Sequence, residues 1–153
     1  MRKKNGFTLI EMTIVMGLLA IVGSMSMVVN MDMYRGYMFR NEQNVLISVL
    51  EKARSQSVNN ICLGSTCTDG QPHGVKILPG KYVIFQGADY DSREAAADEE
   101  INAASSMDFS GSSISEVVFQ QLSGDVSAPG EIKISNNIRT VTISINNEGQ
   151  IDY

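Results

Sequence analysis

One carboxylate stands near the start of a long apolar stretch in this chain of 153 residues. It belongs to Glu11, and the next charged side chain is that of Asp32. A lone carboxylate inside a membrane helix costs roughly 2.5–3.5 kcal/mol on insertion scales, and such residues usually have a function. Neither a plain membrane anchor nor a secretory signal peptide needs a carboxylate here, so Glu11 is the first candidate for a functional residue.

Cys62 and Cys67 form the second candidate site. If this part of the chain is exported, a disulfide between them is expected, and the small loop that it closes is worth about 2 kcal/mol in the chain-entropy model. Zinc is the competing hypothesis, but it needs two more ligands. The only histidine, His73, lies beside Pro72 and Gly74 in an expected turn. We therefore favour a disulfide, with free thiols as the second possibility.

An acidic segment offers the third candidate. Asp89, Asp91 and Glu100 stand at the first, third and twelfth positions of a calcium loop. Arg93, however, occupies a ligand position, and Glu94 occupies the position that requires glycine. We predict a solvated acidic loop and no metal site.

Enzymatic chemistry finds little support in the sequence. The chain has a single histidine and lacks a phosphate-binding glycine loop, a zinc motif and a serine in a nucleophile-elbow pattern. We expect no catalytic residues, no cofactor and no enzymatic activity.

The elements that would position Glu11 begin with a short basic segment and an apolar run that extends to about Met31. Basic residues before an apolar segment stay in the cytoplasm, so the rest of the chain should be exported. A helix over residues 7–29 would be about 35 Å long, enough to cross a bilayer core. A single-pass anchor and a signal peptide cleaved near Ser24-Met25-Ser26 both remain open at this point.

The residues around Glu11 read Gly6-Phe7-Thr8-Leu9-Ile10-Glu11-Met12, after the basic leader. This motif resembles the processing site that type IV pilins share with the pseudopilins of type II secretion. The resemblance implies that a prepilin peptidase cleaves between Gly6 and Phe7 on the cytoplasmic face. It also implies that the same enzyme N-methylates Phe7 and that the apolar segment is retained.

In a filament built from such chains, the apolar helices of many subunits would bundle together. The new amine at Phe7 and the carboxylate of Glu11 would each be costly there, and pairing them between neighbouring subunits would offset part of the cost. Glu11 would thereby set the axial register of an incoming subunit. Gly6, the smallest residue, would let the peptidase approach the scissile bond.

The helix should continue beyond the apolar run to about Asn60, where Asn59, Asn60 and then Gly64 mark its end. Five apolar residues repeat at helical spacing and should pack against a globular part: Val45, Leu46, Val49, Leu50 and Ala53. The charged residues of the segment should fall largely on other faces: Arg40, Glu42, Glu51, Lys52 and Arg54.

Beyond residue 60 the sequence predicts strands and turns. Segments 74–78 and 81–85 flank Pro79-Gly80 and should form a hairpin. Further strands are expected at 115–122, 131–135, 140–146 and 150–153, the last after a turn at Asn147-Glu148-Gly149. The predicted fold class is α+β, with a long N-terminal helix packed on a C-terminal antiparallel β domain.

The expected organisation has four parts. Residues 1–6 form a cleaved leader, 7–31 a transmembrane or filament-core helix, 32–60 an amphipathic helix, and 61–153 the β domain. The Ala-Arg-Ser run at residues 53–55, the hairpin ending at Phe85 and the closing Val-x-Ile-x-Ile pattern before Gly149 resemble the H-type minor pseudopilins of type II secretion and the T-type minor pilins. The sequence departs from them at Gln150, where a basic residue is expected.

Charge argues against a nucleic acid partner. Loss of the leader would remove three of the 12 basic residues and leave 9 against 17 acidic ones, a side-chain charge of −8. Phosphate binding requires a basic patch, and the sequence contains none. DNA binding would require folding to gather Lys76, Lys81, Lys133 and Arg139 on one face.

We therefore expect a structural subunit, more specifically a minor one, of a type IV pilus or a type II secretion pseudopilus. Its partners would be the prepilin peptidase, other pilin or pseudopilin subunits, an inner-membrane assembly platform and, before assembly, membrane lipid. It would cross the inner membrane once, with its N-terminus in the cytoplasm. The alternatives are a major pilin subunit, or a binding domain that is secreted or anchored in the membrane.

Overall fold

A computed structural model describes residues 6–64, 67–104, 107–136 and 139–153, but not the side chains of residues 26–32. Residues 1–5 of the expected leader therefore lie outside the described residues, as do the side chains at the end of the expected 7–31 helix. The chain divides into two compact units, Met1–Met38 and Phe39–Tyr153. The division falls within the segment 32–60, which we expected to be an amphipathic helix.

Helix α1 covers Leu9–Val58 and contributes to both units. At its end, Ile61 N donates a hydrogen bond to Gln56 O (2.9 Å), and Asn60 N donates one to Ser57 O (3.1 Å). Asn60 has a φ of 54°, the left-handed conformation that closes a Schellman motif. Asparagine tolerates this conformation better than most residues, so the local sequence explains why the helix ends here.

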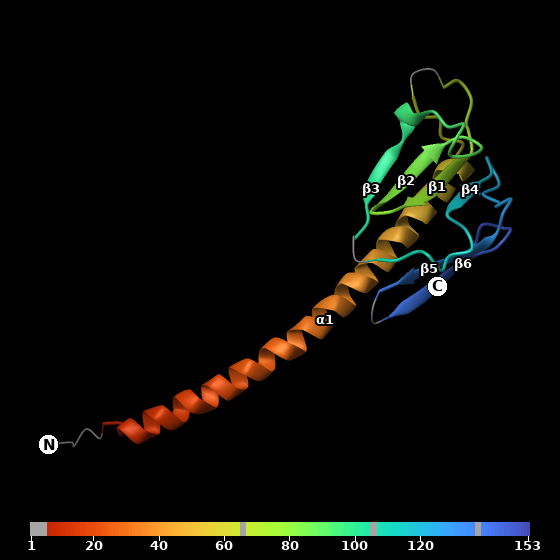
Figure 1. The fold of residues 1–153 in the computed structure, drawn as a ribbon. Coiled ribbons are helices and arrows are strands. Elements are labelled where there is room, and N and C mark those ends of the chain that lie inside the picture. Colours follow the sequence, from red (N-terminus) through yellow and green to blue (C-terminus); the bar gives the residue numbers. More distant parts are fainter. Residues whose placement is uncertain (1–5, 65–66, 105–106, 137–138) are drawn as a thin grey trace. The chain divides into compact units, whose positions relative to one another are not determined.

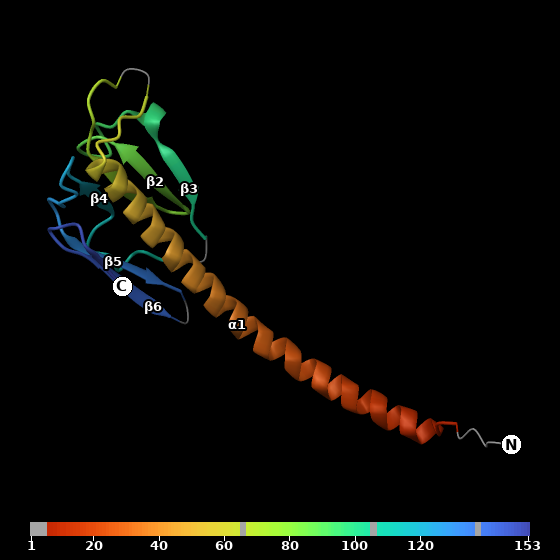
Figure 2. The same cartoon turned by 180° about the vertical axis from the view of Figure 1, so that it is seen from behind.

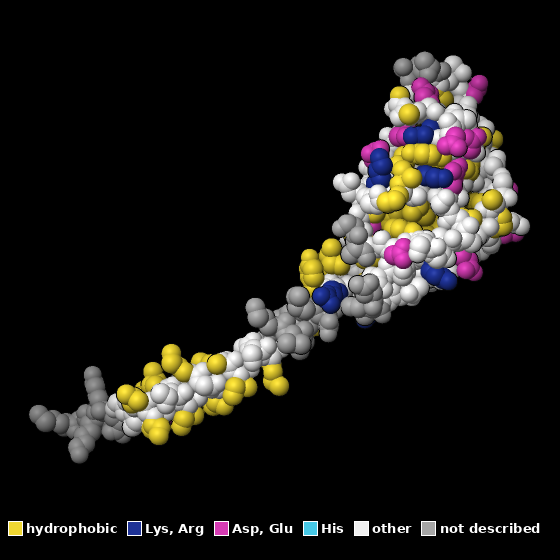
Figure 3. Space-filling model, in the orientation of Figure 1, with side chains coloured by type: hydrophobic (Ala, Val, Ile, Leu, Met, Phe, Trp, Pro, Cys, Tyr) yellow, Lys and Arg dark blue, Asp and Glu magenta, His cyan; other side chains and the backbone are white. Residues whose placement is uncertain are grey.

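The described side chains of the first unit form no apolar core. Every described side chain from Phe7 to Met25 is exposed, and Phe7 and Leu9 are more than four-fifths exposed. Figure 3 shows hydrophobic side chains around this stretch of the helix. An apolar surface of this kind requires a cover that the isolated chain does not supply.

The second unit contains two antiparallel sheets and the C-terminal part of α1 (Figure 1). The larger sheet has the order β3-β2-β1-β4, and the smaller has the order β5-β6-β7. The strands are β1 His73–Leu78, β2 Lys81–Gln86, β3 Glu99–Asn102, β4 Glu116–Phe119, β5 Gly130–Ser135, β6 Thr140–Ile145 and β7 Ile151–Asp152. A 3-10 turn, η1, covers Ala95–Ala97.

The expected hairpin is confirmed as β1 and β2, in which Leu78 pairs with Lys81 across Pro79-Gly80. Gly80 has a φ of 79°. A two-residue turn with proline in its first position requires such a positive φ at its second residue. The strands expected near residues 115, 131, 140 and 150 correspond to β4, β5, β6 and β7. β4 is shorter than expected because Leu122 enters a turn with a φ of 66°.

The core lies between α1 and the two sheets, and Figure 2 shows α1 crossing the face of the larger sheet. The predicted apolar face of α1 is buried there, apart from Val45, which is half-buried. The strands contribute mainly β-branched and aromatic side chains, among them Val75, Ile84, Phe119 and Ile143. Phe39 and Ile47 also belong to the core, although the helical pattern did not single them out.

Three sequence-based expectations are corrected by the structure. Glu42, expected away from the apolar face of α1, is only 5% exposed. His73, expected in a turn, is fully buried at the start of β1. The acidic segment that we expected to be a loop ends in strand β3, whose Glu99 and Glu100 pair in register with Ile84 and Val83 of β2.

Candidate processing and assembly site

The two residues of the expected cleavage site lie just before α1, outside any helix or strand. Gly6 is exposed, and Phe7 is 82% exposed. Nothing lies within 4 Å of the position that a Cβ atom would occupy at Gly6. A side chain at position 6 would therefore clash with none of the described residues. The reason that we expect for a glycine here is access of a peptidase to the peptide bond that follows it.

Glu11 caps the helix that contains it. Its Oε2 atom accepts hydrogen bonds from Thr8 N and Thr8 Oγ1, both at 3.2 Å. Glu11 N donates in return to Thr8 Oγ1 at 3.3 Å. This reciprocal arrangement is a capping box, which satisfies backbone donors at the start of a helix. The Thr-x-x-Glu spacing is the sequence signature of such a cap, which was not among the features expected for Glu11.

No membrane-spanning helix is found in the described part of the chain, where no helix has both the length and the hydropathy that a span requires. The transmembrane helix expected over residues 7–31 is therefore not confirmed by the length and hydropathy of the described residues.

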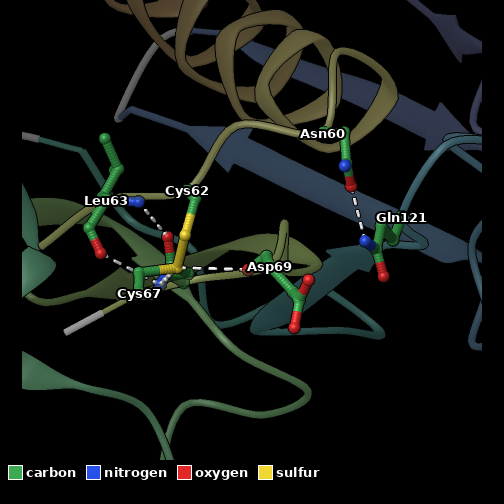
Figure 4. The surroundings of a disulfide bond; sticks show 7 residues. Asn60, Cys62, Leu63, Cys67, Asp69 and Gln121 are labelled. Atoms are coloured by element: carbon green, nitrogen blue, oxygen red, sulfur yellow. Dashed lines mark hydrogen bonds between the residues drawn. A yellow bond between two sulfur atoms is a disulfide. The ribbon is translucent and has the colours of Figure 1, made fainter.

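Cys62 and Cys67 are joined by a disulfide, and their Cα atoms are 5.7 Å apart, within the ordinary range for a bridge. Figure 4 shows the bond directly after the end of α1, beside Leu63 and Asp69. Leu63 N donates to Gln86 Oε1 at 2.6 Å, and Gln86 Nε2 donates to Leu63 O at 3.3 Å. The disulfide loop is therefore tied to strand β2 as well as closed on itself.

Among the described residues, no group of three or more His, Cys, Asp or Glu side chains is arranged to hold a metal ion. Ser92 donates to both carboxylate oxygens of Asp89, through its backbone N–H and its hydroxyl, each at 2.7 Å. These hydrogen bonds lower the pKa of Asp89 and keep it ionised. Asp98 is not solvated as expected, because it pairs with Arg93 at 2.8 Å and its side chain is only 10% exposed.

A buried polar pair links α1 to β2, and no sequence motif indicated it. Tyr82 Oη donates a hydrogen bond of 2.7 Å to Glu42 Oε1, and the tyrosine is fully buried. Burial, assisted by this bond and by the charge of Glu42, raises the pKa of the Tyr82 phenol well above its usual range. The phenol therefore stays protonated and remains a donor at all ordinary pH values.

His73 is a second buried polar residue. Its backbone N–H donates to Ser57 Oγ at 2.7 Å, but neither ring nitrogen has a hydrogen-bond partner among the described residues. Burial lowers the pKa of His73, because the charged imidazolium loses its hydration, and the nearby backbone of Gln71 offsets only part of this effect. The folded domain therefore holds this ring in its neutral form.

We expect the domain to lose stability as the pH falls from neutral to about 5. The unfolded chain binds a proton at His73 near the ordinary pKa of about 6.5, whereas the folded chain resists protonation. The free energy of unfolding should change by at most about 1.4 kcal/mol per pH unit, which is the limit when one proton is bound. Urea unfolding of the detergent-solubilised chain at a series of pH values measures this dependence. His73→Met should make the free energy of unfolding nearly independent of pH above the range in which carboxylates titrate. Because the chain has a single histidine, an unchanged curve in this variant would contradict the assignment.

Comparison with protein families identifies the N-terminal segment. Residues 1–27 match the model of the prokaryotic N-terminal methylation motif. This match supports a type IV pilin-like prepilin, processed by a prepilin peptidase and assembled with other pilin subunits. The motif also suggests a membrane anchor followed by a location in a pilus, although no membrane-spanning helix is found among the described residues. No curated protein and no solved structure matches the chain.

The residues of the candidate site lie close together along the chain. Gly6, Phe7 and Glu11 all lie within the matched motif, at or before the first turn of α1. Thr8 joins them through the capping box. Glu11 lies four residues after Phe7, the residue at which we expect the processed chain to begin.

Proposed function

We propose that this prepilin is a minor structural subunit of a type IV pilus or a type II secretion pseudopilus. A prepilin peptidase cleaves it between Gly6 and Phe7 and methylates the new N-terminus. Before assembly it crosses the inner membrane once, with its N-terminus in the cytoplasm, among membrane lipid. An assembly platform in that membrane then adds it to the filament, in which the apolar part of α1 packs against other subunits.

The observation that carries this proposal is the methylation motif over residues 1–27. Two structural features support it. The described side chains from Phe7 to Met25 are exposed although most are apolar, so they need a cover outside the chain. Glu11 lies among them in the first turn of α1, where its charge is costly unless a partner is provided.

The minor role rests on the C-terminal pattern. The closing Val-x-Ile-x-Ile segment forms β6, and the turn at Gly149 leads into β7. The resemblance to H-type and T-type subunits depends in part on this succession of strand, glycine turn and strand. The proposal assigns no catalytic activity and no cofactor to the chain, which serves as the substrate of the peptidase.

Intact mass and N-terminal fragmentation of the protein purified from its host membranes test the proposal. The expected product begins at Phe7 with one methyl group on its amine. A chain that begins after Ser26, or that still begins at Met1, would overturn it. Counting subunits in purified filaments by quantitative mass spectrometry then tests the minor role, because a major subunit would dominate the preparation.

A further inference from the structure

Three large side chains of α1 are exposed directly before the part of the helix that enters the core of the second unit. Met33, Tyr34 and Tyr37 are 70%, 62% and 69% exposed. The contribution of the helix to that core begins at Phe39, which is 1% exposed. The two tyrosines therefore occupy the last turn of α1 that is free of the globular core.

These side chains lie on one side of the helix. Tyr34 and Tyr37 are three residues apart and Met33 and Tyr37 are four apart, the spacings at which helical residues are neighbours. Arg35 is also exposed and is rotated by about 100° from Tyr34, so it flanks them. We call these four residues the tyrosine face: Met33, Tyr34, Arg35 and Tyr37. Tyrosine has an apolar ring and a polar tip, and it is enriched where a bilayer meets water.

The position of the tyrosine face along α1 matches the thickness of a membrane. From Leu9, where α1 begins, the helix rises about 38 Å to Tyr34 and about 42 Å to Tyr37, at ~1.5 Å per residue. A bilayer with its headgroups is about 40–45 Å thick. If the start of α1 lies in the headgroups of one leaflet, the tyrosine face lies in those of the other.

We propose that the tyrosine face is an interfacial anchor, which contacts phospholipid headgroups on the exported side of the inner membrane before the subunit joins a filament. The tyrosine rings pack against the upper acyl chains, and their hydroxyl groups donate to ester and phosphate oxygens. The guanidinium of Arg35 pairs with a phosphate group. The proposal rests on the proposed function, because a chain inserted in the membrane presents this face to lipid. It adds the residues that fix the depth of the helix.

Continuity and charge favour lipid as the occupant. The tyrosine face continues the exposed apolar surface that runs from Phe7 to Met25, the part of α1 that the proposed function places in the bilayer. Between Glu11 and Asp32 no charged residue interrupts the sequence, and Arg35 is the first basic residue after the leader. An apolar run that ends in tyrosines and an arginine is the pattern of a helix that emerges through phosphate headgroups.

Fluorescence quenching in vesicles tests the inference. The chain contains no tryptophan, so a single introduced tryptophan reports only its own surroundings. The full chain with Tyr37→Trp is reconstituted at low density in vesicles of phosphatidylethanolamine and phosphatidylglycerol, with a quencher attached either to the headgroup or near the end of the acyl chain. We expect the headgroup quencher to remove most of the emission and the deep quencher to remove little.

Two matched variants and a charge variant serve as controls. Leu19→Trp, in the middle of the exposed apolar stretch, should be quenched in the opposite order, and Tyr153→Trp, at an exposed tyrosine of the second unit, by neither quencher. Adding Arg35→Gln should reduce headgroup quenching at position 37 more in these anionic vesicles than in phosphatidylcholine vesicles. A purely structural effect of this substitution would be the same in both lipids.

Two results at position 37 would overturn the inference. One is emission that only a water-soluble quencher reduces. The other is emission protected from both kinds of quencher, which would assign the tyrosine face to a second copy of the chain. If position 19 is quenched by the deep label while position 37 is quenched by neither lipid label, the membrane-inserted subunit stands and only the anchor fails. If position 19 is not quenched either, the membrane step of the proposed function fails with it.

Discussion

Replacement of Glu11 by alanine should block assembly of this subunit into filaments while leaving its cleavage at Gly6 intact. In the assembled state, we expect the Glu11 carboxylate to pair with the methylated amine of Phe7 in a neighbouring subunit. Removing the carboxylate leaves that amine buried without a partner, a loss of about 3–5 kcal/mol. The subunit content of sheared or purified filaments measures assembly, and the mass of the mature chain measures processing.

The capping box offers a competing explanation for Glu11, because the same carboxylate also accepts hydrogen bonds from Thr8. Thr8→Val removes the hydroxyl but keeps the carboxylate, so it weakens the cap by about 1 kcal/mol. We expect this variant to assemble, and we expect Glu11→Gln, which keeps an acceptor but not the charge, to fail. If Thr8→Val and Glu11→Ala were equally defective, Glu11 would act through the cap and not through a neighbouring amine.

Replacement of Tyr82 by phenylalanine removes only one oxygen atom, but it should destabilise the β domain by about 2–3 kcal/mol. The phenol is the hydrogen-bond donor to Glu42, whose side chain is 5% exposed. Without it, a buried carboxylate loses a partner, and its desolvation is no longer compensated. The edge-to-face contact of this ring with Phe109, with centroids 5.9 Å apart, should survive in the variant. Chemical unfolding of the solubilised chain measures the loss.

A double-mutant cycle separates the hydrogen bond from the packing. Tyr82→Phe combined with Glu42→Leu removes both partners, and such a replacement by apolar groups can be nearly neutral. We therefore expect the double variant to be more stable than the sum of the two single changes predicts. Glu42→Gln serves as the matched control, because it keeps an acceptor oxygen for Tyr82 and should cost about 1 kcal/mol or less. Additive effects across the cycle would show that the two side chains do not act as a pair.

The parts of the fold that were predictable from the sequence depend on local patterns. Pro79-Gly80 between two alternating segments specifies both the turn and the register of the β1–β2 hairpin. The apolar spacing from Leu46 to Ala53 likewise predicts which face of α1 is buried. The methylation motif is also local, because it consists of one short linear stretch, residues 1–27.

The features that could not be predicted depend on partners distant in sequence. Glu42 is buried because Tyr82, forty residues away, provides a donor, and no helical pattern contains that information. Strand β3 has two adjacent glutamates and weak strand propensity. It forms because β2 offers a pairing edge, and because Lys52 and Lys81 form ion pairs with Glu99 and Glu100.

The acidic β3 strand has a consequence for copies crowded together at a membrane or in a filament. It lies at one edge of its sheet, where unpaired backbone groups would otherwise attract the edge of another molecule. Its paired charges must be desolvated before a foreign strand can approach. In the other sheet, β7 is only two residues long, and the edge of β5 is already bonded to the segment around Asp108 and Ser113. Such edges resist amyloid-like stacking of strands, so ordered association of copies is left to contacts between side chains.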